Sequence, residues 1–513
     1  MGEIAAEYWK RRKGFILAAI GSAIGLGNIW RFSWLTYRNG GGAFLIPYFI
    51  ALLIVGVPLL ILEFLLGNYF AGSSPKVFRK IRDNLEIIGW IAILDVFIIG
   101  TYYAVVLAWV FDYIWLSIAY APQLATGQLS ASTLFSNLVS NPWLVLVGLA
   151  VTWFVTWYTV FRGVSEGIEK ASLIAIPLLW ILSVILVIRG VTLPGADMGI
   201  NWYLTPHFSK LTQGSVWIDA FGQILFTLSI MAAPLIVYAS YMPKKSELPN
   251  SAWITAFANC GFSFFFGFAT WGIIGYLMSL NNVASPEALK IPLGGGGLAF
   301  ITIPTAMSRL PGGPSVAAIF GLIFFLVLWL AGYTSLISII EPVYAALRDK
   351  FGATRRQTVT AVTIISFIIG LIFVFKPGMI DPVDFMVGST NLVWIVLLEA
   401  AVAGFYLGVK KLREYANPYA ELKLGVWFDY LVKYAAPISM AVILFYGLWY
   451  AKAQVFVYSI IKTGKTVAVN TLGTVNGVHP VSLIVMIALL IAAILVTGLK
   501  WKTELKETVT TEV

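Results

Sequence analysis

The chain has 513 residues, of which 59% are hydrophobic and only 11% are charged, and its mean hydropathy is +0.87. Soluble proteins carry roughly 25% charged residues, so the composition excludes a soluble protein and predicts a polytopic protein that resides in the lipid bilayer. The formal net charge of +10 does not require a nucleic-acid partner, because lysine and arginine collect on the cytoplasmic side of membrane proteins. The single cysteine, Cys260, excludes an internal disulfide and a cysteine-based metal cluster.

Twelve apolar stretches are long enough to span a membrane, since each span needs about 20 apolar residues. They lie near residues 14–37, 42–70, 88–120, 143–161, 168–189, 215–241, 250–280, 315–346, 357–375, 380–408, 427–451 and 479–500. If both termini are cytoplasmic, most lysines and arginines fall on the cytoplasmic side, as the positive-inside rule requires. We therefore predict a multi-pass plasma-membrane protein with a cytoplasmic N-terminal segment, 1–13, and a cytoplasmic tail, 501–513.

The first span is unusual because it combines Gly21, Gly25 and Gly27 with the polar Asn28 and the charged Arg31. Each glycine costs about 1 kcal/mol in a helix relative to alanine. A tightly packed, glycine-rich helix would explain the glycines alone. It would not explain the polar and charged side chains, which are expensive at membrane depth and usually functional. We therefore predict a broken helix whose freed backbone groups line a binding cavity.

The sixth span shows a similar interruption. Gln223, Thr227 and Ser229 fall near its middle, and Pro234 removes a helical hydrogen bond. Unusual segments at corresponding positions of two halves indicate a transporter built from inverted repeats. The pattern predicts a first repeat over 14–189, an extracellular loop over 190–214, a second repeat over 215–408, and two further spans over 427–500.

Other polar residues lie inside later or neighbouring spans. Glu63, in the second span, is expected to be paired or hydrogen-bonded within the protein. Thr334 and Ser335 lie in the eighth span; such hydroxyls most often bond to their own helix, but oxygen ligands also suit hard cations such as sodium. Asp384 begins the tenth span at the outer face, with a charge opposite to that of Arg31.

Three motifs, at 25–32, 39–44 and 222–229, carry a family resemblance. On these motifs the chain resembles the neurotransmitter:sodium symporters, the family with the LeuT fold, over roughly residues 8–500. The resemblance implies an all-α polytopic fold of five-plus-five inverted repeats, with broken first and sixth helices and two additional carboxyl-terminal helices. It also implies that the protein is not an enzyme but a symporter that works by alternating access.

The resemblance implies two sodium sites and one substrate site. The first sodium would be held by the substrate carboxylate with Ala23, Asn28, Thr227 and Asn259, and the second by Gly21, Ile24, Ala331, Thr334 and Ser335. The substrate would be surrounded by Ser22, Ala23, Gly25, Leu26, Gly27, Ile99, Tyr103, Phe226, Thr227, Ser229, Met231, Ala232, Ser335 and Ile339. Sodium ligation by the substrate itself would couple the two binding events.

Gly25 indicates the substrate class within this resemblance. Monoamine transporters of the family carry an aspartate at this position, which pairs with an amine that has no carboxylate of its own. Glycine therefore implies an α-amino acid, and the surrounding side chains imply an apolar or aromatic one. Ala232 stands where leucine-transporting members carry a large aromatic residue, and Met231 replaces a usual glycine, so the pocket is reshaped. A carrier of another small amine or osmolyte is the alternative.

A requirement for chloride is expected from the balance of charges at the substrate and sodium sites. Two sodium ions and one carboxylate leave a net charge that is costly in a low-dielectric site. Many bacterial members supply a carboxylate in the seventh span, but the matching residue here is Ser263. The resemblance then implies one chloride held by Tyr48, Gln223, Thr227, Asn259 and Ser263. Alternatively, these groups bond one another and a proton or water balances the charge.

The resemblance also implies two gates. Arg31 and Asp384 would close the outer side, and Asp349 and Trp9 would belong to the inner gate. Ala6 occupies the place of an arginine that the family carries before the tryptophan. Either one of the basic residues that follow Trp9 substitutes for it, or the inner gate is weaker.

An ion channel and an intramembrane enzyme are the two alternative classes of protein. Broken helices also build the selectivity filters of ion channels, but two different broken spans in one chain fit alternating access better. An intramembrane enzyme is disfavoured because His207 and His479 lie in loops and Ser335 has no histidine base nearby in sequence. Both a monomer and a homodimer are compatible with the sequence.

Overall fold

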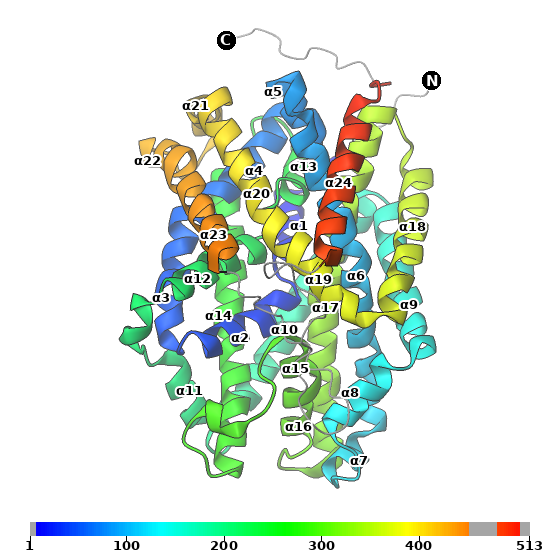
Figure 1. Ribbon diagram of the computed structural model, residues 1–513, viewed down its shortest axis with the longest axis vertical. Helices are drawn as coiled ribbons and strands as arrows, with labels where there is room; N and C mark the ends of the chain where they lie inside the picture. The colour runs from blue at the N-terminus through cyan, green and yellow to red at the C-terminus, as the bar shows by residue number, and fades with distance from the viewer. Residues whose placement is uncertain (1–6, 451–479, 503–513) are drawn as a thin grey trace.

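The computed structural model describes residues 7–450 and 480–502, and these residues form an all-helical bundle (Figure 1). The described chain begins and ends at the upper end of the bundle in this view. Predictions that concern residues 1–6, including Ala6, residues 451–479, including His479, and the tail beyond residue 502 lie outside the described residues.

Most of the predicted spans are long helices in the structure. They contain α3 (Gly42–Ala51), α4 (Val57–Phe70), α6 (Glu86–Ala119), α9 (Pro142–Phe161), α10 (Lys170–Val191), α14 (Pro249–Leu280), α17 (Gly313–Phe351), α18 (Arg355–Phe375), α20 (Leu392–Ala401), α23 (Ala436–Tyr450) and α24 (Pro480–Gly498). By length and composition, ten stretches of the described chain can each cross a membrane, and one bent helix pair raises the number to eleven.

The bent pair is the predicted first span. Helix α1 (Arg12–Ala23) stops at Ile24, whose backbone is extended, and the chain resumes as η1 (Gly27–Arg31) and α2 (Phe32–Arg38). The two halves meet at an angle of 57°. The glycines and polar residues in this span therefore mark a real break, as the sequence predicts.

The predicted sixth span is divided as well. Helix α12 (Gly214–Thr227) and α13 (Pro234–Ser240) are separated by six residues, 228–233, and neither is long enough to cross a membrane alone. Ser229 and Ala232 in this gap have left-handed backbone conformations, with φ of 54° and 53°. Such conformations are unfavourable for residues with a Cβ atom. The predicted number of twelve spans thus depends on α12 and α13 acting as one broken span.

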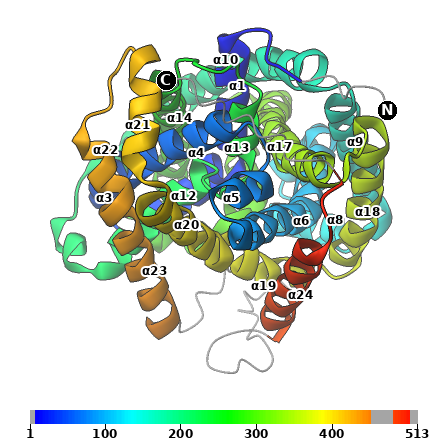
Figure 2. The same ribbon diagram turned by 90° about the horizontal axis from the view of Figure 1, so that it is seen from above.

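Both breaks lie inside the bundle. Helix α1 packs against α10, α13, α14 and α17, while α17 packs along α6. Seen from above, α4, α13 and α17 lie near the centre, whereas α9, α18, α23 and α24 lie at the rim (Figure 2). Interrupted backbone at membrane depth is tolerated only where protein or a cavity surrounds it, and this packing meets that requirement.

Candidate substrate and ion site

A pocket lies where the two helix breaks meet α6 and α17. It is lined by all the predicted substrate residues except Ala232. It is also lined by Asn28 and Asp384, which the sequence assigns to sodium and to the outer gate, and by four residues that sequence reasoning assigned to no site, namely Tyr102, Pro234, Ser338 and Leu392. Leu392 comes from the tenth predicted span, for which the motifs carried no substrate signal. The break of each helix thus places its freed backbone beside a cavity.

The residues predicted for the first sodium site are brought together at the first break. The Asn28 side chain accepts a hydrogen bond from the Gly25 amide (2.9 Å) and donates one to Asn259 Oδ1 (2.7 Å). The Asn259 amide group in turn donates to Thr227 Oγ1 at 3.2 Å. Three side chains from α12, α14 and the first broken span therefore form one buried polar chain beside the pocket.

The residues predicted for the second sodium site meet between α1 and α17. Ser335 Oγ donates to the Ser22 carbonyl at 3.0 Å, and Thr334 Oγ1 donates to the Ala331 carbonyl at 3.1 Å. A Cβ atom placed on Gly21 would lie 3.4 Å from Thr334 Oγ1. Carbonyl and hydroxyl oxygens from the end of α1 and the middle of α17 are thus adjacent, which is the donor type that a hard cation prefers.

The two polar ends of the pocket differ in their backbone groups. On one side the Leu26 amide, at the start of the second half-helix, points toward Tyr103 Oη at 3.5 Å. Helix N-termini favour anionic groups. On the other side the Ser22 carbonyl, near the end of α1, accepts hydrogen bonds from Ser229 and Ser335. Carbonyl groups at a helix end favour cationic groups.

Glu63 stabilises the second break. Its Oε1 accepts hydrogen bonds from the amides of Met231 (2.9 Å) and Ala232 (2.6 Å), and its side chain is fully buried. These bonds fix the left-handed backbone at Ala232. This arrangement accords with the structural role that the sequence predicts for Glu63. Ala232, which the resemblance assigns to the substrate, does not line the pocket, whereas its neighbour Met231 does.

The predicted outer-gate residues lie near the pocket but have separate partners. Arg31 donates to Gln223 Oε1, and its guanidinium carbon lies 4.7 Å from the centre of the Phe226 ring. Asp384 accepts a hydrogen bond from Tyr102 Oη at 2.6 Å. The structure therefore shows both charges at the site without a direct ion pair between them. Tyr102 is the partner that sequence reasoning missed.

The predicted inner-gate residues lie at the opposite end of α1. Trp9 is buried, and its indole nitrogen donates to the Tyr238 carbonyl at 2.7 Å. Asp349 pairs with its neighbour Arg348 at 2.8 Å and accepts a hydrogen bond from the Ser73 amide, also at 2.8 Å.

The basic residues that follow Trp9 have other partners. The Lys10 ammonium pairs with Glu166, and its backbone amide donates to Glu169. Lys10 is therefore not placed at Asp349 in this structure.

A different residue connects the N-terminal segment to the bundle. Arg355, the first residue of α18, donates two hydrogen bonds to the Glu7 carboxylate and two to Glu341, the latter at 2.9 and 2.6 Å. Tyr241 Oη also donates to Glu341, at 2.6 Å. Sequence reasoning missed this cluster, because nothing in the local sequence of Glu7 distinguishes it from a solvated charge.

The residues predicted to hold chloride also meet, in the layer between α3, α12 and α14. Ser263 Oγ accepts a hydrogen bond from Asn28 at 2.9 Å. Within the described part of the chain, the buried Gln223 Nε2 has no hydrogen-bond partner. The buried Tyr48 Oη lies against Ser263 and Cys260 without making a hydrogen bond of normal geometry to either. Buried donors without partners are costly. Tyr48 Oη and Gln223 Nε2 therefore need an acceptor that the described side chains do not supply.

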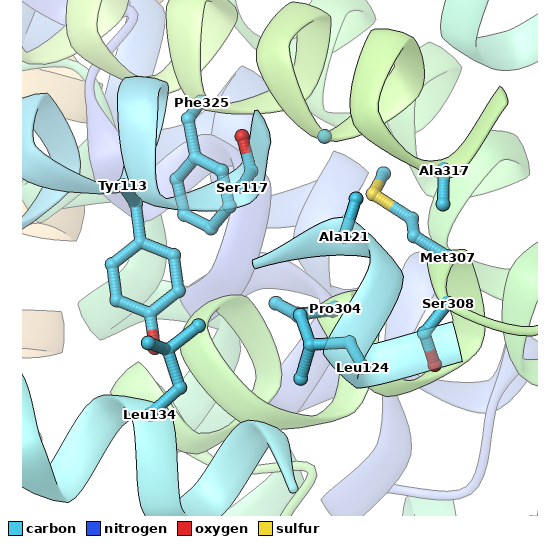
Figure 3. A pocket seen from close by; sticks show the side chains of 11 residues that line it. Tyr113, Ser117, Ala121, Leu124, Leu134, Pro304, Met307, Ser308, Ala317 and Phe325 are labelled. Atoms are coloured by element: carbon cyan, nitrogen blue, oxygen red, sulfur yellow. The ribbon is translucent and has the colours of Figure 1, made fainter. Parts of the chain in front are cut away.

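A separate small pocket lies between the ends of α6, α16 (Ile303–Met307) and α17. Its wall is largely apolar, with hydroxyl groups from Tyr113, Ser117 and Ser308 (Figure 3). It contains none of the predicted substrate, ion or gate residues. The pocket between the helix breaks is therefore the candidate functional site.

Comparisons with known proteins agree with this geometry. The model of the sodium:neurotransmitter symporter family matches residues 6–133 and 126–496. The chain is 41% identical to an uncharacterized sodium-dependent transporter of Methanocaldococcus jannaschii over 87% of this chain and 91% of the relative. It is 30% identical to the human sodium- and chloride-dependent GABA transporter 2, over 80% of this chain and 74% of that protein.

The structure is also similar to that of a solved transporter. The crystal structure of MhsT in complex with L-phenylalanine matches with a TM-score of 0.74 and 29% identity, over 86% of this chain and 99% of that chain. The match confirms the predicted LeuT-like fold, and the family match confirms the resemblance found in the motifs. The chain is a multi-pass, sodium-dependent membrane transporter, not an enzyme, and it belongs to the sodium:neurotransmitter symporter family.

Proposed function

We propose that the protein imports an apolar or aromatic α-amino acid together with sodium by alternating access, and that transport depends on chloride. The observation that supports this proposal is the pocket between the two helix breaks. Its amide-bearing end suits a carboxylate, and its carbonyl-bearing end suits an ammonium group. The Leu26 amide and Tyr103 hydroxyl would bind the carboxylate, and the carbonyls near Ser22 would bind the ammonium group.

The pocket has no room for an acidic side chain in place of Gly25, and this favours an amino acid over a simple amine as the substrate. A Cβ atom on Gly25 would lie 2.8 Å from Ser335 Oγ and 3.2 Å from Tyr103 Oη. Among the described residues that line the pocket, Asp384 is the one acidic residue, and it is held by Tyr102. An amine without its own carboxylate would therefore lack a counterion at the carbonyl end. MhsT, whose structure is similar, was crystallised with L-phenylalanine.

Sodium would occupy two positions in the proposed cycle. Asn28, Thr227, Asn259, the Ala23 carbonyl and the substrate carboxylate would hold the first ion, so that substrate and ion stabilise each other's binding. Thr334, Ser335 and the carbonyls of Gly21, Ile24 and Ala331 would hold the second ion between α1 and α17. Because these ligands come from separate helices, sodium binding would favour the arrangement in which α1 packs against α17.

The chloride proposal rests on two buried donors. Tyr48 Oη and Gln223 Nε2 lack partners among the described residues, and Ser263 provides no negative charge where a carboxylate would neutralise the sodium. A chloride ion accepting from these groups, with Thr227, Asn259 and Ser263 nearby, would satisfy them and balance the charge. The human GABA transporter 2 is named sodium- and chloride-dependent.

The proposed arrangement places the protein in the plasma membrane with both termini in the cytoplasm, as a monomer or homodimer. Arg31 and Asp384 would close the outer side of the pocket, and Trp9 and Asp349 the inner side. A carrier of another small amine or osmolyte is the second candidate, because the relatives include transporters named for taurine and creatine.

The deciding experiment measures binding of a panel of labelled amino acids to the purified protein in sodium chloride, potassium chloride and sodium gluconate. We expect an apolar or aromatic amino acid to bind in sodium chloride only. Sodium-dependent binding that persists in gluconate would contradict the chloride site and leave the amino-acid site intact. Binding of taurine or creatine, with no amino acid binding under any condition, would favour the second candidate.

A further inference from the structure

The rim of the bundle contains a groove between α9 and α18, which pack side by side and face away from the centre in both views (Figures 1 and 2). The groove has a volume of about 270 Å³, and its floor contains Trp153, Trp157 and Thr363. Its mouth is open: Phe154 is 62% exposed and Ile364 is 54% exposed. A protein surface of this kind at membrane depth is in contact with acyl chains.

Two arginines mark one end of the groove. Arg162 follows α9 directly, and Arg356 lies in the first turn of α18; both side chains are exposed. Arg356 lies over the Phe161 ring at 5.6 Å, and Arg162 donates to Tyr158 Oη at 2.8 Å. Neither arginine forms an ion pair with an acidic residue in the part of the chain that the structure describes. Both arginines therefore lie next to Phe161 at this end of the groove, Arg356 over its ring and Arg162 as its neighbour in the chain.

The apolar groove continues from this basic end. The Phe161 ring is tilted against that of Trp157, with 4.9 Å between the ring centres, and Trp157 donates to Thr360 Oγ1 at 3.0 Å across the two helices. The groove itself begins at Trp157, one helical turn from Phe161, and extends to Trp153, about 6 Å further along α9, since a helix rises 1.5 Å per residue. Trp153 Nε1 and Thr363 Oγ1, on its floor, have no hydrogen-bond partner among the described residues.

We propose that this groove binds an anionic phospholipid, with its phosphate between Arg162 and Arg356 and an acyl chain along Trp157 toward Trp153. Basic residues beside transmembrane helices attract anionic head groups at the membrane surface. A free phosphate would use the arginines but would leave the groove empty, whereas a phospholipid satisfies both features. The site lies on the rim of the bundle, outside the substrate and ion pocket, so it does not depend on the proposed substrate.

The test titrates the purified full-length chain with phosphatidylglycerol and counts retained lipid by native mass spectrometry. We expect one tightly retained lipid, and about 30-fold weaker retention in the double variant Arg162→Gln/Arg356→Gln, given the attraction of each arginine for an anionic surface. The variant Lys410→Gln/Lys423→Gln removes two exposed charges elsewhere and serves as the matched control. Its retention should equal that of the unmodified chain.

A second variant tests the acyl-chain groove independently of the two arginines. Ile364→Trp fills the mouth of the groove without changing charge, and it should weaken retention of phosphatidylglycerol. Excess inorganic phosphate should not displace the lipid, and phosphatidylcholine should be retained far less. Unchanged retention in either the double-arginine variant or Ile364→Trp would overturn the proposal, and so would displacement by phosphate. Elution profile and unfolding temperature establish that each variant is folded.

Discussion

The Glu7–Arg355 contact predicts how the proposed inner gate is held closed. Glu7 belongs to the segment that precedes α1, whereas Arg355 begins α18 and also pairs with the fully buried Glu341. The side chains of Glu7 and Arg355 are only 18% and 11% exposed. In the variant Glu7→Gln, Arg355 keeps Glu341 but loses a charged partner, so the connection between the N-terminal segment and α18 weakens.

The size of the effect follows from the geometry. Hydrogen bonds to charged groups contribute about 1.5–3 kcal/mol. The lower value applies because Glu7 retains some contact with solvent and glutamine keeps one acceptor. A loss of about 1.5 kcal/mol changes the ratio of closed to open inner states by roughly tenfold. Because the substituted residue precedes Trp9, we expect the opening to include α1.

Hydrogen–deuterium exchange of the peptide that contains α1 measures this opening. We expect exchange in Glu7→Gln to be about tenfold faster than in the unmodified chain, if exchange follows the open population. Glu414→Gln is the matched control, because Glu414 forms an exposed pair with Lys410 and such pairs contribute little. Equal exchange in Glu7→Gln and Glu414→Gln would refute the inference that the Glu7–Arg355 contact holds the proposed inner gate closed.

Three further predictions concern the pocket and the loop between α13 and α14. Gly25→Asp should abolish amino-acid binding without unfolding the protein, because even a Cβ atom would lie 2.8 Å from Ser335 Oγ; normal affinity in a binding assay would contradict the described pocket. Ser263→Glu should remove the chloride requirement, because a fixed carboxylate about 4 Å from a cation contributes about 4 kcal/mol at an effective dielectric of 20. Amino-acid binding to the variant in sodium gluconate measures the loss of this requirement. Binding that still depends on chloride would contradict the prediction. Burial, with the nearby Lys80 and Lys76, lowers the pKa of Lys244 from 10.5 to about 8. Below pH 8 Lys244 is charged in both states, and its charge destabilises the folded state. As the pH rises from 8 toward 10.5, the folded state loses this charge before the unfolded state does, so the destabilisation disappears. The unfolding temperature of the unmodified chain relative to Lys244→Gln should therefore increase between pH 8 and pH 10, and a constant difference would count against the shifted pKa.

The sequence by itself determined the class of protein and the two interrupted helices. Helix breaks are local. Glycines that disfavour a helix lie within a few residues of polar side chains around Gly25, and polar side chains lie within a few residues of Pro234 near Ser229. The family motifs then indicated the pocket, and the structure places every predicted substrate residue except Ala232 on its wall. The roles of these residues in binding sodium, chloride and substrate stay predictions.

Only the tertiary structure decided which charged and polar groups are partners. Glu7 pairs with a residue 348 positions away, and Asp384 binds Tyr102 on a helix 282 positions earlier. The amides of Met231 and Ala232 both donate to Glu63, in two backbone hydrogen bonds that no sequence pattern reveals. A sequence records which side chains exist and where a helix is weak, because both are local properties. Which donor meets which acceptor depends on helices that pack together from distant parts of the chain.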